Sequence, residues 1–142
     1  MASVAERPGY RLKLAQHALR TRMDAALRTL GITAPQYAVL SAIEQQPGLS
    51  NAALARAAFV TAQSMQGIVA NLERGGLLAR SQDPSHGRVL NTVLTAAGRR
   101  ILARAHAAVG GVEAAMLQGL SRAETAALGD LLARCAANLR AL

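Results

Sequence analysis

The chain has 142 residues and a mass of 14.8 kDa, with 51% hydrophobic residues but only two tyrosines, one phenylalanine and no tryptophan, so a single helix-rich domain is expected. Sixteen Lys and Arg residues against eight Asp and Glu residues give a net charge of +8, which favours a polyanionic partner or a soluble basic surface. The single cysteine excludes a disulfide scaffold, and the lack of a signal-peptide pattern or a bilayer-length apolar run favours a soluble cytoplasmic protein without membrane contact.

The first two helices are predicted from periodicity and capping signals. Residues 10–30 carry apolar side chains spaced by three and four, which predicts one amphipathic helix that Gly31 ends. Thr33 and Gln36 have the spacing of a capping box with a proline in the first turn, so a second helix is expected to start there. Residues 47–48, a Pro-Gly pair, end it.

The next stretch predicts a short helix, a turn and a longer helix. Ser50 is the expected cap of the short helix, and residues 59–60 form the turn. Thr61 opens the longer helix, which runs to about Glu73 before residues 75–76, a Gly pair, break it. The side chains expected to face inward from the short helix are Leu54, Ala57 and Ala58.

A change of pattern after residue 76 predicts a β-hairpin. Residues 77–82 and 88–94 have strand character, and the segment 83–87 between them contains Pro and Gly. Residues 33–94 therefore have the size and order of a winged helix-turn-helix, within a mainly α fold that has a small β-hairpin wing.

The chain is expected to return to helix from residue 96 to about 117, with the Gly110–Gly111 pair weakening or bending it. Ser121 and Glu124 form a second capping box that begins a last helix. The helices of residues 10–30 and 96–142 are too long and too apolar on one side to be linkers.

The fourth predicted helix separates polar from apolar side chains. Uncharged amides and hydroxyls suit the edges of DNA bases, although a solvated polar face has the same pattern. Its place after a short helix and before a hairpin favours DNA reading. The polar side comprises Thr61, Gln63, Ser64, Gln66, Gly67, Ala70 and Asn71, and the apolar side Met65, Ile68, Val69 and Leu72.

Several stretches in order carry a resemblance to a known family. They are residues 30–40, Leu54-Ala55-Arg56, residues 71–78, and residues 83–88 followed by 94–99. From about Tyr10 to Leu139 the chain resembles the MarR family of bacterial transcription regulators. It departs from the family pattern at His86, where the wing commonly has an acidic residue. A reactive N-terminal cysteine is also lacking, so a thiol switch is not expected, and Cys135 is expected to be a small buried apolar residue.

The resemblance implies a set of DNA-binding residues and a ligand crevice. Arg88, on the wing, would contact the minor groove, the alternative being a solvated arginine near Asp83. Residues His17, Arg20 and Tyr37 would lie near a crevice for a small aromatic or phenolic effector, although His17 is also expected as a packed helix residue. The full DNA-binding set is Ser50, Thr61, Gln63, Ser64, Gln66, Gly67, Asn71, Arg74 and Arg88.

The resulting hypothesis is a homodimeric, ligand-responsive repressor that binds double-stranded DNA at a pseudo-palindromic operator. Residues 10–30 and 96–142 would form the dimerisation region, because the leucine stripes 12/19/27 and 128/131/139 have too little partner surface within one chain. A sequence-tolerant architectural DNA-binding protein is the alternative. An enzyme is disfavoured, since the three histidines lack metal-ligand spacing and no nucleotide or nucleophile motif occurs, so neither catalytic residues nor a metal or cofactor is expected.

Overall fold

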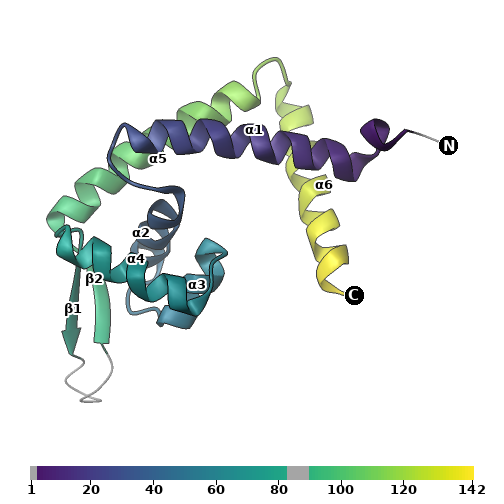
Figure 1. Cartoon of the computed structure of the whole chain (residues 1–142). Coiled ribbons are helices and arrows are strands. Elements are labelled where there is room, and N and C mark those ends of the chain that lie inside the picture. The colour runs from purple at the N-terminus through teal and green to yellow at the C-terminus, as the bar shows by residue number, and fades with distance from the viewer. Residues whose placement is uncertain (1–2, 83–89) are drawn as a thin grey trace. The chain divides into compact units, whose positions relative to one another are not determined.

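The structure is a computed structural model that describes residues 3–82 and 90–142 (Figure 1). A short 3-10 helix (Val4–Glu6) precedes the helices and strands, which are α1 (Pro8–Arg28), α2 (Ala34–Gln45), α3 (Asn51–Ala58), α4 (Ala62–Arg74), β1 (Leu78–Gln82), β2 (Leu90–Leu94), α5 (Ala96–Met116) and α6 (Arg122–Arg140). The chain divides into two compact units, Met1–Val112 and Glu113–Leu142. The predicted mainly α fold with a small β-hairpin is confirmed.

The predicted capping box at the start of α2 forms in both directions. The backbone N–H of Gln36 donates to Thr33 Oγ1 at 3.2 Å, and the backbone N–H of Thr33 donates to Gln36 Oε1 at 3.0 Å. Two of the orphan donors at the helix N-terminus are thereby satisfied, which fixes where α2 begins.

The core of the first unit joins five elements, α2, α3, α4, β1 and α5. On α3 the structure corrects one expectation, because Ala55 is buried and Ala57 is exposed. The buried stripe of this short helix is centred between Leu54 and Ala55, so position 57 falls on its outer side. The fully buried large side chains of this core are Val39, Leu40, Ile43, Leu54, Met65, Val69, Leu72 and Leu102.

A second, smaller cluster joins the end of α1 to α5. Leu27 is fully buried there, together with Ile32 and Ala105. The prediction that Leu27 belongs to a stripe without a partner inside one chain is therefore wrong. Leu12, at the other end of α1, keeps 47% of its surface exposed, so only the N-terminal part of the stripe is uncovered.

The hairpin and the start of α5 are fastened to the end of α4. The strands pair antiparallel, with Leu78 opposite Leu94. Gly76 has φ +75°, a conformation that favours glycine, and this lets the N–H of Leu77 return to the carbonyl of Leu72 at 3.0 Å. The Thr95 hydroxyl donates to the Gly76 carbonyl at 2.6 Å and accepts from the N–H of Gly98 at 3.0 Å.

The second unit, residues 113–142, contains the end of α5 and all of α6. The backbone N–H of Ser121 donates to the Glu124 carboxylate at 2.9 Å, and this bond, helped by the Ser121 hydroxyl, lowers the pKa of Glu124. None of the residues of α6 is buried in the single chain. Cys135 is exposed, so the expectation of a buried thiol is wrong for the single chain, in which its apolar neighbours Leu131 and Leu132 are exposed too.

The long helix α5 passes through Gly110–Gly111 as continuous helix. The sequence predicted a weakened or bent helix at this pair, and the helix assignment shows no interruption there. Among the described residues, none of the helices combines the length and the apolar character needed to cross a membrane.

Candidate nucleic-acid interface and a neighbouring hollow

The turn between α3 and α4 sets the start of α4 at the surface. Thr61 Oγ1 accepts from the N–H of Ser64 at 3.1 Å and donates to Ser64 Oγ at 3.0 Å. Ser50 caps α3 in the same manner, accepting from the N–H of Ala53 at 3.2 Å. Between them, Phe59 adopts left-handed backbone angles and ends α3. The hydroxyls of Ser50 and Thr61, both in the predicted DNA-binding set, thus stabilise helix starts.

The two faces of α4 differ as the sequence analysis expects. The apolar face is inside the protein, where Met65 and Val69 are fully buried and Leu72 is 1% exposed. The opposite face carries no charge until the last turn, so it can approach DNA bases without a strong preference for phosphate. The residues exposed on it are Gln63, Ser64, Gln66, Gly67 and Asn71.

The positive charge on this face of α4 is Arg74, in the last turn of the helix. The Arg74 guanidinium donates to Asn71 Oδ1 one turn earlier, so these two predicted DNA-binding residues contact each other. This bond leaves the Asn71 amide N–H groups as donors, while Arg74 keeps further N–H groups for a phosphate.

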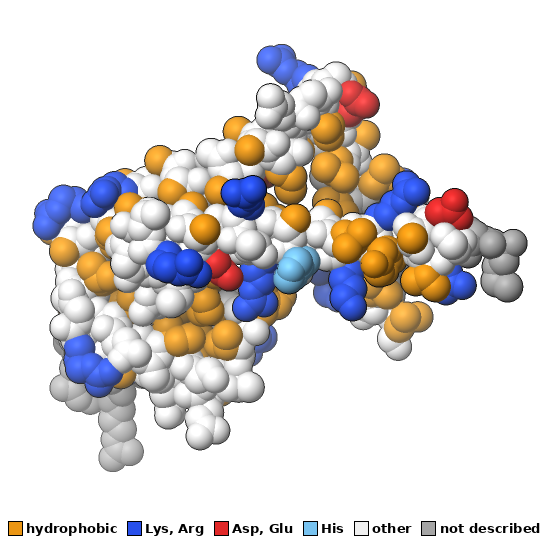
Figure 2. Space-filling view, turned by 45° about the horizontal axis from the view of Figure 1, so that its top comes forward, with side chains coloured by type: hydrophobic (Ala, Val, Ile, Leu, Met, Phe, Trp, Pro, Cys, Tyr) orange, Lys and Arg blue, Asp and Glu red, His pale blue; other side chains and the backbone are white. Residues whose placement is uncertain are grey.

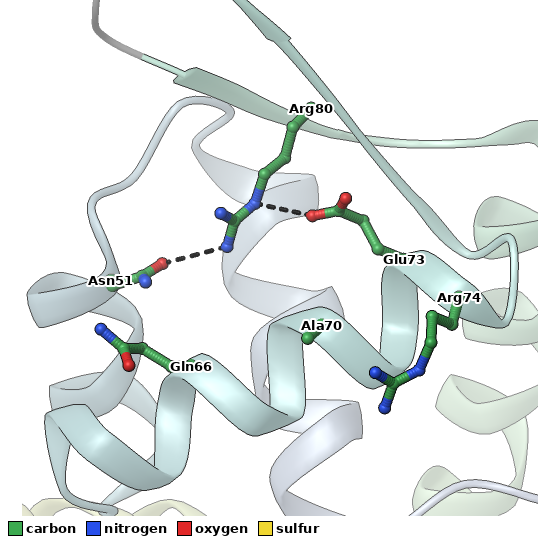
Figure 3. Close-up of a pocket in the computed structure, with 6 residues that line it drawn as sticks. All are labelled: Asn51, Gln66, Ala70, Glu73, Arg74 and Arg80. Atoms are coloured by element: carbon green, nitrogen blue, oxygen red, sulfur yellow. Dashed lines mark hydrogen bonds and ion pairs between the residues drawn. The ribbon is translucent and has the colours of Figure 1, made fainter.

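A hollow of about 520 Å³ lies beside α4 and brings three elements together (Figure 3). At its edge Arg80, from β1, reaches to Glu73 of α4, with Nε and Oε1 2.8 Å apart. Its Nη2 also lies 3.5 Å from Asn51 Oδ1, at the start of α3. The distance between Arg80 Nε and Glu73 Oε1 is that of an ion pair. The buried Nε has no hydrogen-bond acceptor among the described residues, because the Glu73 oxygen does not lie along its N–H direction. Arg80 thus connects the wing strand to both helices of the helix-turn-helix.

We expect Arg80 and Glu73 to be coupled energetically. Both side chains are partly exposed, at 26% and 38%, so solvent screening limits the coupling to roughly 0.5–1 kcal/mol. A double-mutant cycle with Arg80→Ala and Glu73→Ala, followed by urea unfolding, measures this value. The control pairs Glu73→Ala with Arg56→Ala, since Arg56 forms no ion pair within the described part of the chain, and those effects should add. If the stability effects of Arg80→Ala and Glu73→Ala were also additive, the two side chains would not be coupled.

The predicted wing tip, residues 83–88, lies outside the residues that the structure describes. Arg88, the predicted minor-groove contact, lies outside the described residues, as do Asp83 and His86. Their predicted roles remain predictions from the sequence.

A second hollow, of about 730 Å³, lies between α1, α2, the end of α3 and α5. Two of the three residues predicted for an effector crevice, Arg20 and Tyr37, line it together. His17 does not line it. Its side chain is exposed in the single chain, so the alternative prediction of a packed helix residue is not met there either. Phe59, with 95% of its surface exposed, also contributes to the wall.

A chain of hydrogen bonds stands at the wall of this hollow. Tyr37 Oη lies 2.8 Å from Nδ1 of His106, and Nε2 of the same imidazole lies 3.0 Å from Glu44 Oε1. The two rings meet edge to face, with centroids 5.4 Å apart and planes at 78°. Tyr37 and Glu44 come from α2 and His106 from α5, so the chain joins the two helices.

Sequence reasoning missed both of these arrangements. Partners of Tyr37 and Glu44 lie 69 and 62 residues away in the sequence, and Arg80 lies 29 residues from Asn51. The spacing rules of single helices and strands do not reach such separations. The only available signal was that Arg80 and Glu73 are opposite charges on the two sides of a glycine turn.

Comparison with known proteins agrees with this geometry. The MarR family model matches residues 30–89. The HTH-type transcriptional repressor Rv2887 of Mycobacterium tuberculosis is 42% identical over 113 residues, which is 80% of this chain and 81% of that protein.

Two solved structures of Rv2887 have the same fold. Its complex with salicylic acid gives a TM-score of 0.77 at 38% identity and covers 91% of this chain and 96% of the other. Its complex with DNA gives a TM-score of 0.75 at 35% identity and covers 91% and 97%. With the helix-turn-helix, the hairpin and a relative of this identity and coverage, the chain belongs to the MarR family and is a DNA-binding transcriptional regulator.

Proposed function

We propose that the protein is a homodimeric repressor that reads a pseudo-palindromic operator and is released from it by a small aromatic acid. The observation that carries the proposal is α4, whose exposed face is uncharged and whose two ends are fixed by the Thr61 cap and by Glu73–Arg80. A helix held in this way can present amides to base edges in the major groove in a constant register.

In the proposed binding mode the amides of α4 read bases and the arginines contact phosphates. Gln63 and Gln66 would pair with adenine edges, which a glutamine amide matches in both donor and acceptor. Arg74 at the end of α4 and Arg88 on the wing supply the charge that DNA binding requires. The complex of Rv2887 with DNA supports DNA binding by similarity.

Dimerisation through residues 10–30 and 96–142 would cover the apolar side chains that the single chain leaves exposed. Figure 2 shows such side chains spread over one face of the molecule, with Lys and Arg among them. A monomer that exposes so much apolar surface is expected to associate. The exposed large side chains in these segments are Tyr10, Leu12, Leu14, Met116, Leu120, Leu131, Leu132, Leu139 and Leu142.

We therefore expect a dimer in solution at micromolar concentration, because the exposed leucines of α1 and α6 would be buried only by a second copy. Sedimentation equilibrium measures the mass directly. A stable species of 14.8 kDa at that concentration would contradict the dimer and, with it, the two-fold operator.

The effector is proposed to bind in the hollow between α1, α2 and α5. Arg20 offers a guanidinium for a carboxylate, since its contact with Asp24 is 3.9 Å long and both side chains are largely exposed. The salicylic acid complex of Rv2887 supports an aromatic acid as ligand by similarity. A ligand wedged between α1 and α2 would change the spacing of the two α4 helices and weaken operator binding.

Selection of bound sequences from random DNA tests the function as a whole. A two-fold motif supports the regulator, and release of the selected duplex by salicylate supports the effector step. Unselective binding would instead favour a sequence-tolerant architectural protein.

A further inference from the structure

The hydrogen-bonded chain Glu44–His106–Tyr37 determines which polar group Tyr37 offers to the hollow. A carboxylate accepts hydrogen bonds, so the 3.0 Å contact with Glu44 requires the hydrogen of the imidazole on Nε2. In the neutral ring Nδ1 is then an acceptor. The 2.8 Å contact with Tyr37 is therefore a bond donated by the phenol. The single hydroxyl hydrogen of Tyr37 is donated to His106, so Oη can offer only its lone pairs, as an acceptor, to a ligand in the hollow.

We propose that Glu44 and His106 are positioning residues that make Tyr37 a hydrogen-bond acceptor toward the effector. The hollow then selects aromatic acids that carry a hydroxyl donor over acids whose hydroxyl is masked or missing. Arg20, on α1, lines the same hollow and is the complementary donor for the carboxylate. The inference rests on the proposed effector site and adds to it a rule for the ligand's second polar group.

The opposite polarity would reverse the preference of the hollow. If the imidazole carried both hydrogens, Nδ1–H would donate to Tyr37, and the phenol would turn its own hydrogen to the hollow and prefer a second acceptor. Arg20 of α1 and Tyr37 of α2 line the hollow together with His106, and Glu44 of α2 contacts its imidazole. Glu44 supplies the acceptor at Nε2, 3.0 Å away, and the imidazole packs edge to face with the Tyr37 ring.

The tautomer can be observed without any ligand. In the full-length protein at slightly alkaline pH, two-dimensional ¹H–¹⁵N spectra of the imidazoles, assigned with His106→Leu, should show a protonated Nε2 and an unprotonated Nδ1 for His106. A neutral Nδ1–H tautomer or a doubly protonated ring at this pH would overturn the proposal.

The selection is measured with the three hydroxybenzoates and their methyl ethers, by calorimetric titration. For the isomer that binds best, the hydroxyl form should bind roughly twofold to tenfold more tightly than its ether, which is the range of one neutral hydrogen bond. His106→Leu frees the Tyr37 hydrogen, so this ratio should fall toward one while the affinity for benzoate stays unchanged. Tyr37→Phe should also abolish the ratio, and Glu44→Leu should lower it part of the way.

Glu113→Leu is the matched control, because it removes an exposed glutamate from the same helix, α5, and should leave the ratio unchanged. A ratio that survives in His106→Leu would mean that the size of the methyl group decides, and the proposal would fail while the effector site stands. If none of the benzoates bound, the effector site itself would be wrong and the selection rule with it. Operator selection would still report on the regulator separately.

Discussion

Replacing Gly98 by alanine is expected to lower the free energy of unfolding by about 3 kcal/mol, because the added methyl group would overpack a close backbone contact. A Cβ at this position would overlap with the carbonyl oxygen of Leu77. That oxygen cannot move aside easily, because it accepts the backbone N–H of Thr95 at 3.1 Å where the hairpin meets α5. The substitution should therefore push the start of α5 away from the end of α4.

Gly9→Ala is the matched control, since Gly9 lies in the first turn of α1 and a Cβ there would meet nothing within 4 Å. Alanine should be neutral there or stabilising by up to about 1 kcal/mol, because it has the higher helix propensity. Urea unfolding followed by circular dichroism gives both values. Equal stability of the two variants would show that the start of α5 adapts and that the close approach to Leu77 carries no cost.

Replacing Gln63 by alanine is expected to reduce discrimination between operator and scrambled DNA by roughly 1–3 kcal/mol, the range of one bidentate amide–base pair. Gln63 is exposed in the first turn of α4, the part of a recognition helix that faces the bases. Its loss should weaken operator binding far more than binding to a scrambled duplex. Binding isotherms on both duplexes across a salt series measure the effect.

Arg88→Ala provides the contrast, because a cation on the predicted wing should contribute equally to both duplexes. Its removal should weaken both and reduce the salt slope by about one unit. If Gln63→Ala weakened both duplexes equally, α4 would not be the sequence-reading element. If Arg88→Ala changed neither affinity nor slope, the wing would not contact DNA.

Elements that depend on near neighbours in the chain could be predicted from the sequence. The capping boxes at Thr33 and Ser121 form as expected, because their donors and acceptors lie within one helical turn. The two faces of α4 follow from a period of 3.6 residues, and the hairpin follows from the strand character of the segments on either side of a stretch with Pro and Gly. The mainly α fold and the family could be recognised for the same reason, since each motif is local.

Burial of individual side chains was less predictable. Leu27 was assigned to an uncovered stripe but packs with Ala105 of α5, and Cys135 was expected inside but is exposed. Both residues lie on amphipathic helices, and periodicity identifies the apolar face without identifying what covers it.

The sequence by itself determined the order of the elements, the face of α4 that is polar and the excess of positive charge. Only the tertiary structure decided that Arg80 joins β1 to α3 and α4, that His106 connects Tyr37 with Glu44, and that Gly98 must lack a side chain. These contacts join residues from separate elements, and their distances depend on how the helices pack. Local propensity contains no information about that packing, so a lone histidine, a strand arginine and a helix glycine look unremarkable in the sequence until the fold brings their partners to them.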